Sequence, residues 1–167
     1  MRRDALMVSM AIALIPGIIL GSAAGVVEAS PSQHSSSTIT VDSRTIPVTL
    51  RIQMDHRAMI EAECLIPAPP AVVWRVLSDY DHLSEIVPFL TESRVIGQRD
   101  GAKFLHQAGR GGLWIFQRRF TVTFQVNERP ESSITFKAID GDFLTFEGFW
   151  RIEAQPDGTR VSHQVTV

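Results

Sequence analysis

The run from Ala58 to Tyr80, AMIEAECLIPAPPAVVWRVLSDY, constrains the fold more than any other part of the sequence. It begins as an alternating segment over Ala58–Ile66, in which Ala62, Cys64 and Ile66 share one parity and are all apolar. Such a period of two is typical of a β-strand with one buried face. We therefore expect a strand here, with these side chains directed into the core.

A helix is expected immediately after this strand. The prolines of Pro67–Pro70 end the strand, and Pro70 suits the first turn of a helix, where its missing N–H leaves no bond unmade. An apolar stripe at helical spacing follows over Ala71–Tyr80. A second short helix is predicted over His82–Val87, and Pro88 stops it.

The rest of the sequence alternates with period two and is punctuated by Gly-rich turns, which is typical of antiparallel strands. The expected strands cover Glu92–Gly97, Lys103–Ala108, Leu113–Asn127, Ser133–Ile139, Phe143–Glu153 and Arg160–Val167. Gly148 lies inside one of them and indicates a bend or a close approach of another group. One strand, two short helices and six further strands make an α+β domain with a curved sheet.

Aromatic side chains and two histidines fall on the parity assigned to the inward face of this sheet. The predicted ligand-pocket residues are Phe104, His106, Phe124, Phe136, Phe146, Trp150 and His163. Singly, each aromatic residue could be ordinary core, and a register error of one residue would turn a histidine outward. As a set on one concave face, they predict a pocket for an apolar ligand whose polar end meets a histidine.

Other kinds of site find little support in the sequence. A net charge of −2 gives no basic field for nucleic acid. The five histidines have no ligand-like spacing, so we expect no metal and no cofactor. Cys64, the only cysteine, reads as a small buried hydrophobe. Asp79 and Asp81 flank Tyr80 and are better explained as helix-end residues than as an acid–base pair.

The N-terminal residues 1–29 resemble a signal peptide. Arg2 and Arg3 precede an apolar stretch over Ala5–Leu20, and Ala29 offers a cleavage site. The alternative is an uncleaved membrane anchor. Residues 30–56 are expected to form a Ser-rich linker and an extra edge strand, and residues 57–167 the ligand-binding domain. The mature protein is expected in the periplasm or outside the cell.

Several motifs resemble the START-like (SRPBCC) superfamily, in its polyketide cyclase/dehydrase and coenzyme Q-binding branch. The matching segments are Ile66–Pro70 with Val73-Trp74, Leu77–Leu83, Val87-Pro88 and Gly141–Trp150. The resemblance implies a helix-grip fold, in which a seven-stranded antiparallel sheet wraps a long C-terminal helix and encloses a hydrophobic cavity. It transfers no catalytic residue. Val167 falls inside a strand pattern, so we expect the C-terminal helix to be missing and the sequence to be a fragment of a longer protein.

The leading hypothesis is an exported, non-enzymatic binding protein for a hydrophobic small molecule such as a lipid, a quinone or a polyketide-like ring. We expect it to associate with a membrane and not to bind nucleic acid. One alternative is a cyclase or dehydratase that uses a histidine or carboxylate of the cavity as its base. The other is a protein-interaction module that uses the sheet face. The sequence leaves the oligomeric state open.

Overall fold

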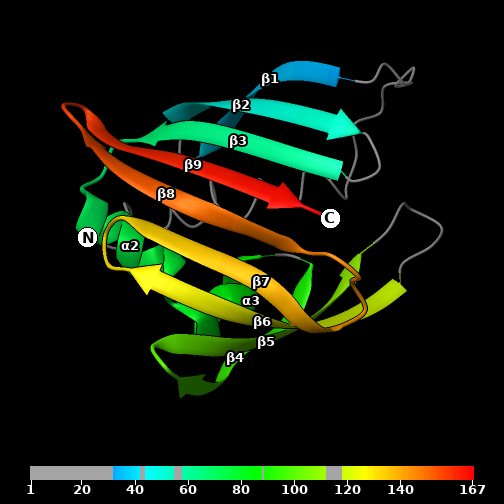
Figure 1. Ribbon diagram of the computed structural model, residues 1–167. Helices are drawn as coiled ribbons and strands as arrows, with labels where there is room; N and C mark the ends of the chain where they lie inside the picture. Colours follow the sequence, from blue (N-terminus) through cyan, green and yellow to red (C-terminus); the bar gives the residue numbers. More distant parts are fainter. Residues whose placement is uncertain (1–31, 42–43, 55–57, 88, 112–117) are drawn as a thin grey trace.

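A computed structural model of the chain describes residues 32–41, 44–54, 58–87, 89–111 and 118–167. Its strands form one antiparallel sheet of nine strands in the order β1-β2-β3-β9-β8-β7-β6-β5-β4 (Figure 1). The strands are β1 Ser32–Val41, β2 Arg44–Met54, β3 Ala58–Ile66, β4 Leu90–Arg99, β5 Ala102–Gly111, β6 Arg118–Arg129, β7 Ser133–Gly141, β8 Glu147–Gln155 and β9 Gly158–Thr166. The region predicted to be a signal peptide or anchor lies outside the described residues.

The seven strands β3 to β9, with short helices after the first of them, confirm the predicted α+β architecture. The helical segment consists of α2 (Pro70–Leu77), the 3₁₀ turn η1 (Tyr80–His82) and α3 (Leu83–Ile86). Pro70 occupies the first turn of α2, as expected. None of the described helices is long and apolar enough to cross a membrane.

Two strands precede this seven-stranded unit. β1 and β2 pair with each other, and β2 pairs with β3 through the register Val48↔Cys64 to Met54↔Ala58. The predicted extra edge strand thus corresponds to β2. β1 covers most of the Ser-rich stretch that was expected to be a linker. Its ladder to β2 gives the backbone groups of this polar segment hydrogen-bond partners.

The core forms where the inward face of the curved sheet meets the short helices (Figure 1). Ala62, Cys64 and Ile66 of β3 are buried, as their parity predicts. Across the sheet they meet the buried face of β9, and the helices contribute a buried stripe. The stripe is Val73, Val76, Leu77 and Tyr80. At the start of the helical segment, Thr159 of β9 donates a hydrogen bond from Oγ1 to the carbonyl oxygen of Ala68 at 2.6 Å.

The predicted start of the strand that became β8 is wrong. Phe143–Phe146 form a loop between β7 and β8, and Leu144 is fully exposed. Asp142 explains this difference. Its carboxylate accepts hydrogen bonds from the backbone N–H and the hydroxyl of Thr121 at 2.6 and 3.2 Å, and its own N–H donates to the Thr121 carbonyl. These bonds hold the loop against β6 in place of a regular ladder.

Candidate functional site

Five phenylalanine rings form a continuous cluster on the inward face of the sheet. Phe120 contacts Phe143 at a centroid distance of 5.6 Å, and Phe143 contacts Phe146 at 5.0 Å. Phe146 in turn meets Phe124 at 5.1 Å and Phe136 at 6.1 Å. All these pairs are edge-to-face, the arrangement in which the positive edge of one ring lies on the negative face of the next.

The cluster is only partly covered by the rest of the protein. Phe124 is buried, at 5% exposure, whereas Phe120, Phe136, Phe143 and Phe146 keep part of their surface open. β6 and β7 supply three of the rings, and the loop held by Asp142 supplies the other two. An apolar surface left partly open on the core side of a curved sheet is suited to an apolar ligand.

Gly148 makes this arrangement sterically allowed. It lies opposite Phe136 in the β7–β8 ladder. A Cβ at this position would overlap the carbonyl oxygen of Gln164 and would lie 2.8 Å from the tip of the Phe136 ring. The close approach expected at this glycine is therefore confirmed, and the group that approaches is one of the predicted pocket residues.

His163 and Trp150 extend the aromatic surface onto β9 and β8. Their rings stack at a centroid distance of 3.8 Å, and Phe136 lies on the imidazole at 6.0 Å with a similar tilt. His163 is 6% exposed, and its Nδ1 lies 3.1 Å from the carbonyl oxygen of Phe149. Burial lowers the pKa of His163 to about 4, and the hydrogen bond to Phe149 offsets only part of this effect. The imidazole is therefore neutral at pH 7.

The structure brings together five of the seven predicted pocket residues. Phe124, Phe136, Phe146, Trp150 and His163 contact one another through the ring pairs described above. The inward placement of the other two, Phe104 and His106, is wrong. They lie opposite Gln125 and Thr123 in the β5–β6 ladder, whereas Leu105 lies opposite the buried Phe124. A one-residue error of parity therefore places both on the outer face.

This error hid a polar cluster on the inward face. With β5 in its true register, Lys103 faces inward opposite the buried Val126. Its Nζ lies 2.9 Å from Oε1 of Glu128, and the Tyr80 hydroxyl donates to the same oxygen at 2.7 Å. Burial, and then the Glu128 carboxylate, raise the pKa of the Tyr80 hydroxyl well above its usual range. The three partly buried groups satisfy one another, which offsets the cost of their partial desolvation.

The sequence pattern gave little indication of the cluster of Tyr80, Lys103 and Glu128. In Lys103–Ala108 both parities carry apolar side chains, so alternation alone does not fix which parity points inward. Phe120 and Phe143 were also missed as members of the site. The alternation of β6 already placed Phe120 on the same face as Phe124, so that residue could have been found.

The remaining candidates for chemistry have structural roles or none. Cys64 is buried, and burial followed by the nearby Glu63 raises the pKa of its thiol to about 12, so it is an unreactive core residue. Asp79 pairs with His82 at 2.7 Å, and Asp81 accepts the backbone N–H of Val95 at 2.7 Å. Asp81 thus ties η1 to β4. No group of acidic, histidine or cysteine side chains in the described part of the chain could hold a metal ion.

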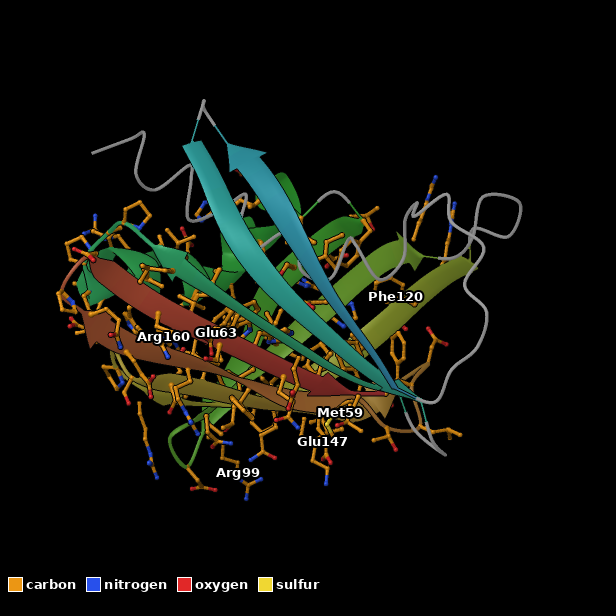
Figure 2. The ribbon with its side chains drawn as sticks, turned by 90° about the horizontal axis from the view of Figure 1, so that it is seen from above. Met59, Glu63, Arg99, Phe120, Glu147 and Arg160 are labelled. Carbon is orange, nitrogen blue, oxygen red and sulfur yellow. The ribbon has the colours of Figure 1, made fainter. Side chains whose placement is uncertain are left out.

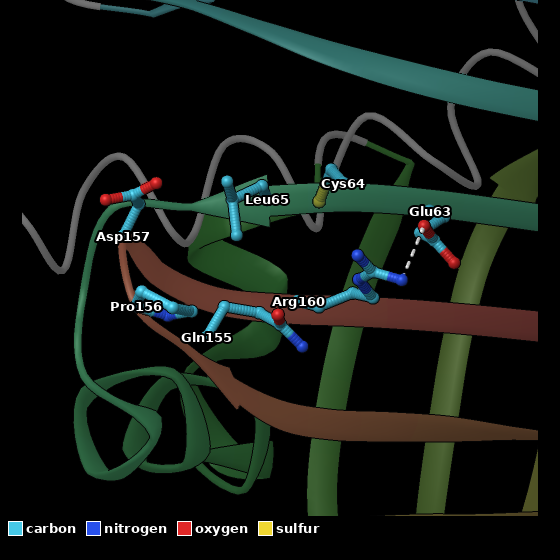
Figure 3. Close-up of a pocket in the computed structure, with 7 residues that line it drawn as sticks. All are labelled: Glu63, Cys64, Leu65, Gln155, Pro156, Asp157 and Arg160. Carbon is cyan, nitrogen blue, oxygen red and sulfur yellow. Dashed lines mark ion pairs between the residues drawn. The ribbon is translucent and has the colours of Figure 1, made fainter.

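A separate pocket of about 390 Å³ lies on the other face of the sheet (Figure 3). Glu63 and Leu65 of β3 and Arg160 of β9 line it. The residues directly before and after each of them in the strand are buried, so these three side chains lie on the face away from the core. Glu63 and Arg160 form an exposed ion pair at 3.8 Å across β3 and β9, and both are labelled in Figure 2. This pocket faces away from the aromatic cluster and is no part of it.

Both the sequence and the fold resemble those of known proteins. A model of the family described as polyketide cyclase / dehydrase and lipid transport matches residues 66–167, more than half of the chain. No curated protein matches the sequence.

Solved structures with the same fold come from several organisms. A protein from Thermus thermophilus is 22% identical with a TM-score of 0.57, over 64% of this chain and 71% of that one. The Zhui aromatase/cyclase from a Streptomyces species is 17% identical with a TM-score of 0.56, over 66% and 67%. A STAR-related lipid transfer protein from Xanthomonas axonopodis is 14% identical with a TM-score of 0.54, over 78% and 80%. At these identities the similarity shows the fold alone.

Proposed function

Because the chain belongs to the polyketide cyclase / dehydrase and lipid transport family, we propose that it binds a hydrophobic small molecule against its aromatic face without catalysing a reaction. Lipids, quinones and polyketide-like rings have the required character. The observation that carries this proposal is the cluster of phenylalanine rings that the rest of the fold leaves partly uncovered. Burying about 300 Å² of ligand surface there would contribute roughly 7 kcal/mol before the entropic cost of association.

A cyclase or dehydratase is the rival function, since the structures with this fold include an aromatase/cyclase. The candidate for its catalytic base that lies within the aromatic cluster is His163. With a pKa of about 4, however, His163 is a weak base at neutral pH, far from the value near 7 that favours general-base catalysis. The low pKa of His163 therefore supports binding over catalysis.

We further propose that the protein is exported and works beside a membrane. The support is the basic and apolar N-terminal pattern described above. The intact mass of the protein purified from the cell envelope tests the proposal, because removal of residues 1–29 gives a defined loss. Full-length protein found only in the cytoplasm would contradict it.

The binding proposal is tested by uptake of N-phenyl-1-naphthylamine, a neutral dye that fluoresces in apolar surroundings. Replacing Phe146 by alanine removes a ring at the centre of the cluster. We expect the affinity for the dye to fall about tenfold, which corresponds to the loss of part of one buried aromatic contact.

Phe104→Ala is the matched control. This residue is also a partly buried phenylalanine, but it lies on the outer face. Its replacement should leave the affinity unchanged, with both variants measured well below their melting temperatures. Equal losses in the two variants, or no dye uptake by the unmodified protein, would count against binding at the aromatic face.

A further inference from the structure

We infer that the ligand of the aromatic face carries a hydrogen-bond donor, a hydroxyl or an N–H group, which binds Nε2 of His163. This inference rests on the proposed function and narrows its ligand class. It follows from which of the two imidazole nitrogens of His163 donates a hydrogen bond and which accepts one.

The first step is the role of Nδ1. This atom lies 3.1 Å from the carbonyl oxygen of Phe149, within hydrogen-bond distance. A carbonyl oxygen accepts and cannot donate, so Nδ1 must carry the proton in this bond. In a neutral imidazole the other nitrogen then has a free lone pair. Nε2 is therefore an acceptor.

The second step is that the ring stays neutral where a ligand would bind. His163 is 6% exposed and stacks against Trp150, at a centroid distance of 3.8 Å, and against Phe136, at 6.0 Å. A charge beside these rings would lose its hydration without gaining a counter-ion. Burial accordingly holds the pKa of His163 near 4.

The third step is that Nε2 is both unpaired and reachable. No hydrogen bond joins it to any residue in the described part of the chain. In the same part of the chain, every fully enclosed side-chain nitrogen or oxygen has a partner. Nε2 is consequently not fully enclosed. It keeps some exposed surface and belongs to a side chain that packs against the rings of Trp150 and Phe136.

The other polar groups on this face do not offer the same site. Lys103 and Tyr80 both donate to one oxygen of Glu128, so that cluster satisfies its own charges. Gln107 donates to Ser93, and Ser93 donates to the carbonyl of Tyr80. His163 is thus the acceptor that lies within the ring cluster.

The chemical consequence is selectivity between molecules of similar shape. Alcohols, phenols and hydroquinones can donate to Nε2, whereas ethers, hydrocarbons and oxidised quinones cannot. A ligand without a donor would cover Nε2 and leave it without water or partner, which is the costly case for a buried acceptor. We therefore expect the protein to prefer the reduced form of a quinone over the oxidised form.

The test compares 2-naphthol, whose hydroxyl can donate a hydrogen bond, with its methyl ether 2-methoxynaphthalene, which has no donor. Each is titrated against N-phenyl-1-naphthylamine bound to the protein at about pH 7.5, where 2-naphthol is neutral. The unmodified protein should bind 2-naphthol about tenfold more tightly, as expected for an unmet buried acceptor. In His163→Phe, which keeps a ring against Trp150, the ratio should fall below about threefold, because no acceptor remains for 2-naphthol to bind or for 2-methoxynaphthalene to cover.

The outcomes separate this inference from the proposed function. Equal affinities of the two naphthalenes for the unmodified protein would overturn the inference even if the variant did not fold. An unchanged ratio in a folded His163→Phe protein, or dye uptake that neither naphthalene displaces, would also overturn it while leaving the proposed function intact. Failure of all three probes to bind would overturn both.

Discussion

Replacing Gly148 by alanine should lower the free energy of unfolding by about 3 kcal/mol or more. The added Cβ would overlap the carbonyl oxygen of Gln164 and press on the Phe136 ring. The carbonyl belongs to the backbone of β9 and cannot turn aside as a flexible side chain would. Relief therefore requires separating two neighbouring strands or displacing a ring of the cluster, and overpacking of this kind is destabilising.

The matched control for this variant is Gly97→Ala. Gly97 also lies in a strand, β4, but a Cβ there would meet nothing within 4 Å. Urea denaturation of the three proteins should show a large loss of stability for Gly148→Ala and a change within about 0.5 kcal/mol for Gly97→Ala. Similar midpoints for Gly148→Ala and the unmodified protein would show that Gln164 and Phe136 do not close on this glycine as described.

The stability of the protein should also depend on pH through His163. Its pKa is about 4 in the folded protein and near its ordinary value of 6.5 in the unfolded chain. Between these values the unfolded chain binds a proton that the folded protein does not bind. The stabilisation is therefore complete above about pH 6.5 and is lost as the pH falls to about 4, by roughly 3 kcal/mol in total.

His163→Phe isolates this contribution from that of the many carboxylates, which also titrate in acid. The free energies of unfolding of the two proteins should be measured by urea denaturation at a series of pH values. Their difference should change steadily between about pH 6.5 and 4 and stay constant above that range. Parallel curves throughout would mean that the folded protein does not disfavour protonation of His163.

The comparison of β9 with β5 shows why some parts of this fold could be predicted and others could not. In β9, Val161, His163 and Val165 alternate with polar residues, and all three proved to be buried. In β5 both parities are mixed, and the aromatic character of Phe104 suggested the wrong face. The true register follows from pairing with β6, where Leu105 meets Phe124. Pairing is a contact between distant segments, and periodicity within one segment does not contain it.

The loop before β8 shows a second limit. Alternation extended the predicted strand back to Phe143, but the carboxylate of Asp142 binds Thr121 on a neighbouring strand and turns the chain. The same bond brings Phe143 onto Phe120, so this loop completes the aromatic cluster. Its role depends on a residue 21 positions earlier in the chain, which local propensity cannot indicate.

The sequence by itself determined the α+β class, the order of strands and helices, the buried face of β3 and β9, and most of the aromatic residues of the site. These features follow from local periodicity and from prolines and glycines, whose effects act over a few residues. The tertiary structure alone decided which face β5 presents, how Tyr80, Lys103 and Glu128 meet, and which nitrogen of His163 is free. Each of these depends on the distance between atoms of remote segments, and that distance exists only after the sheet has paired and curved.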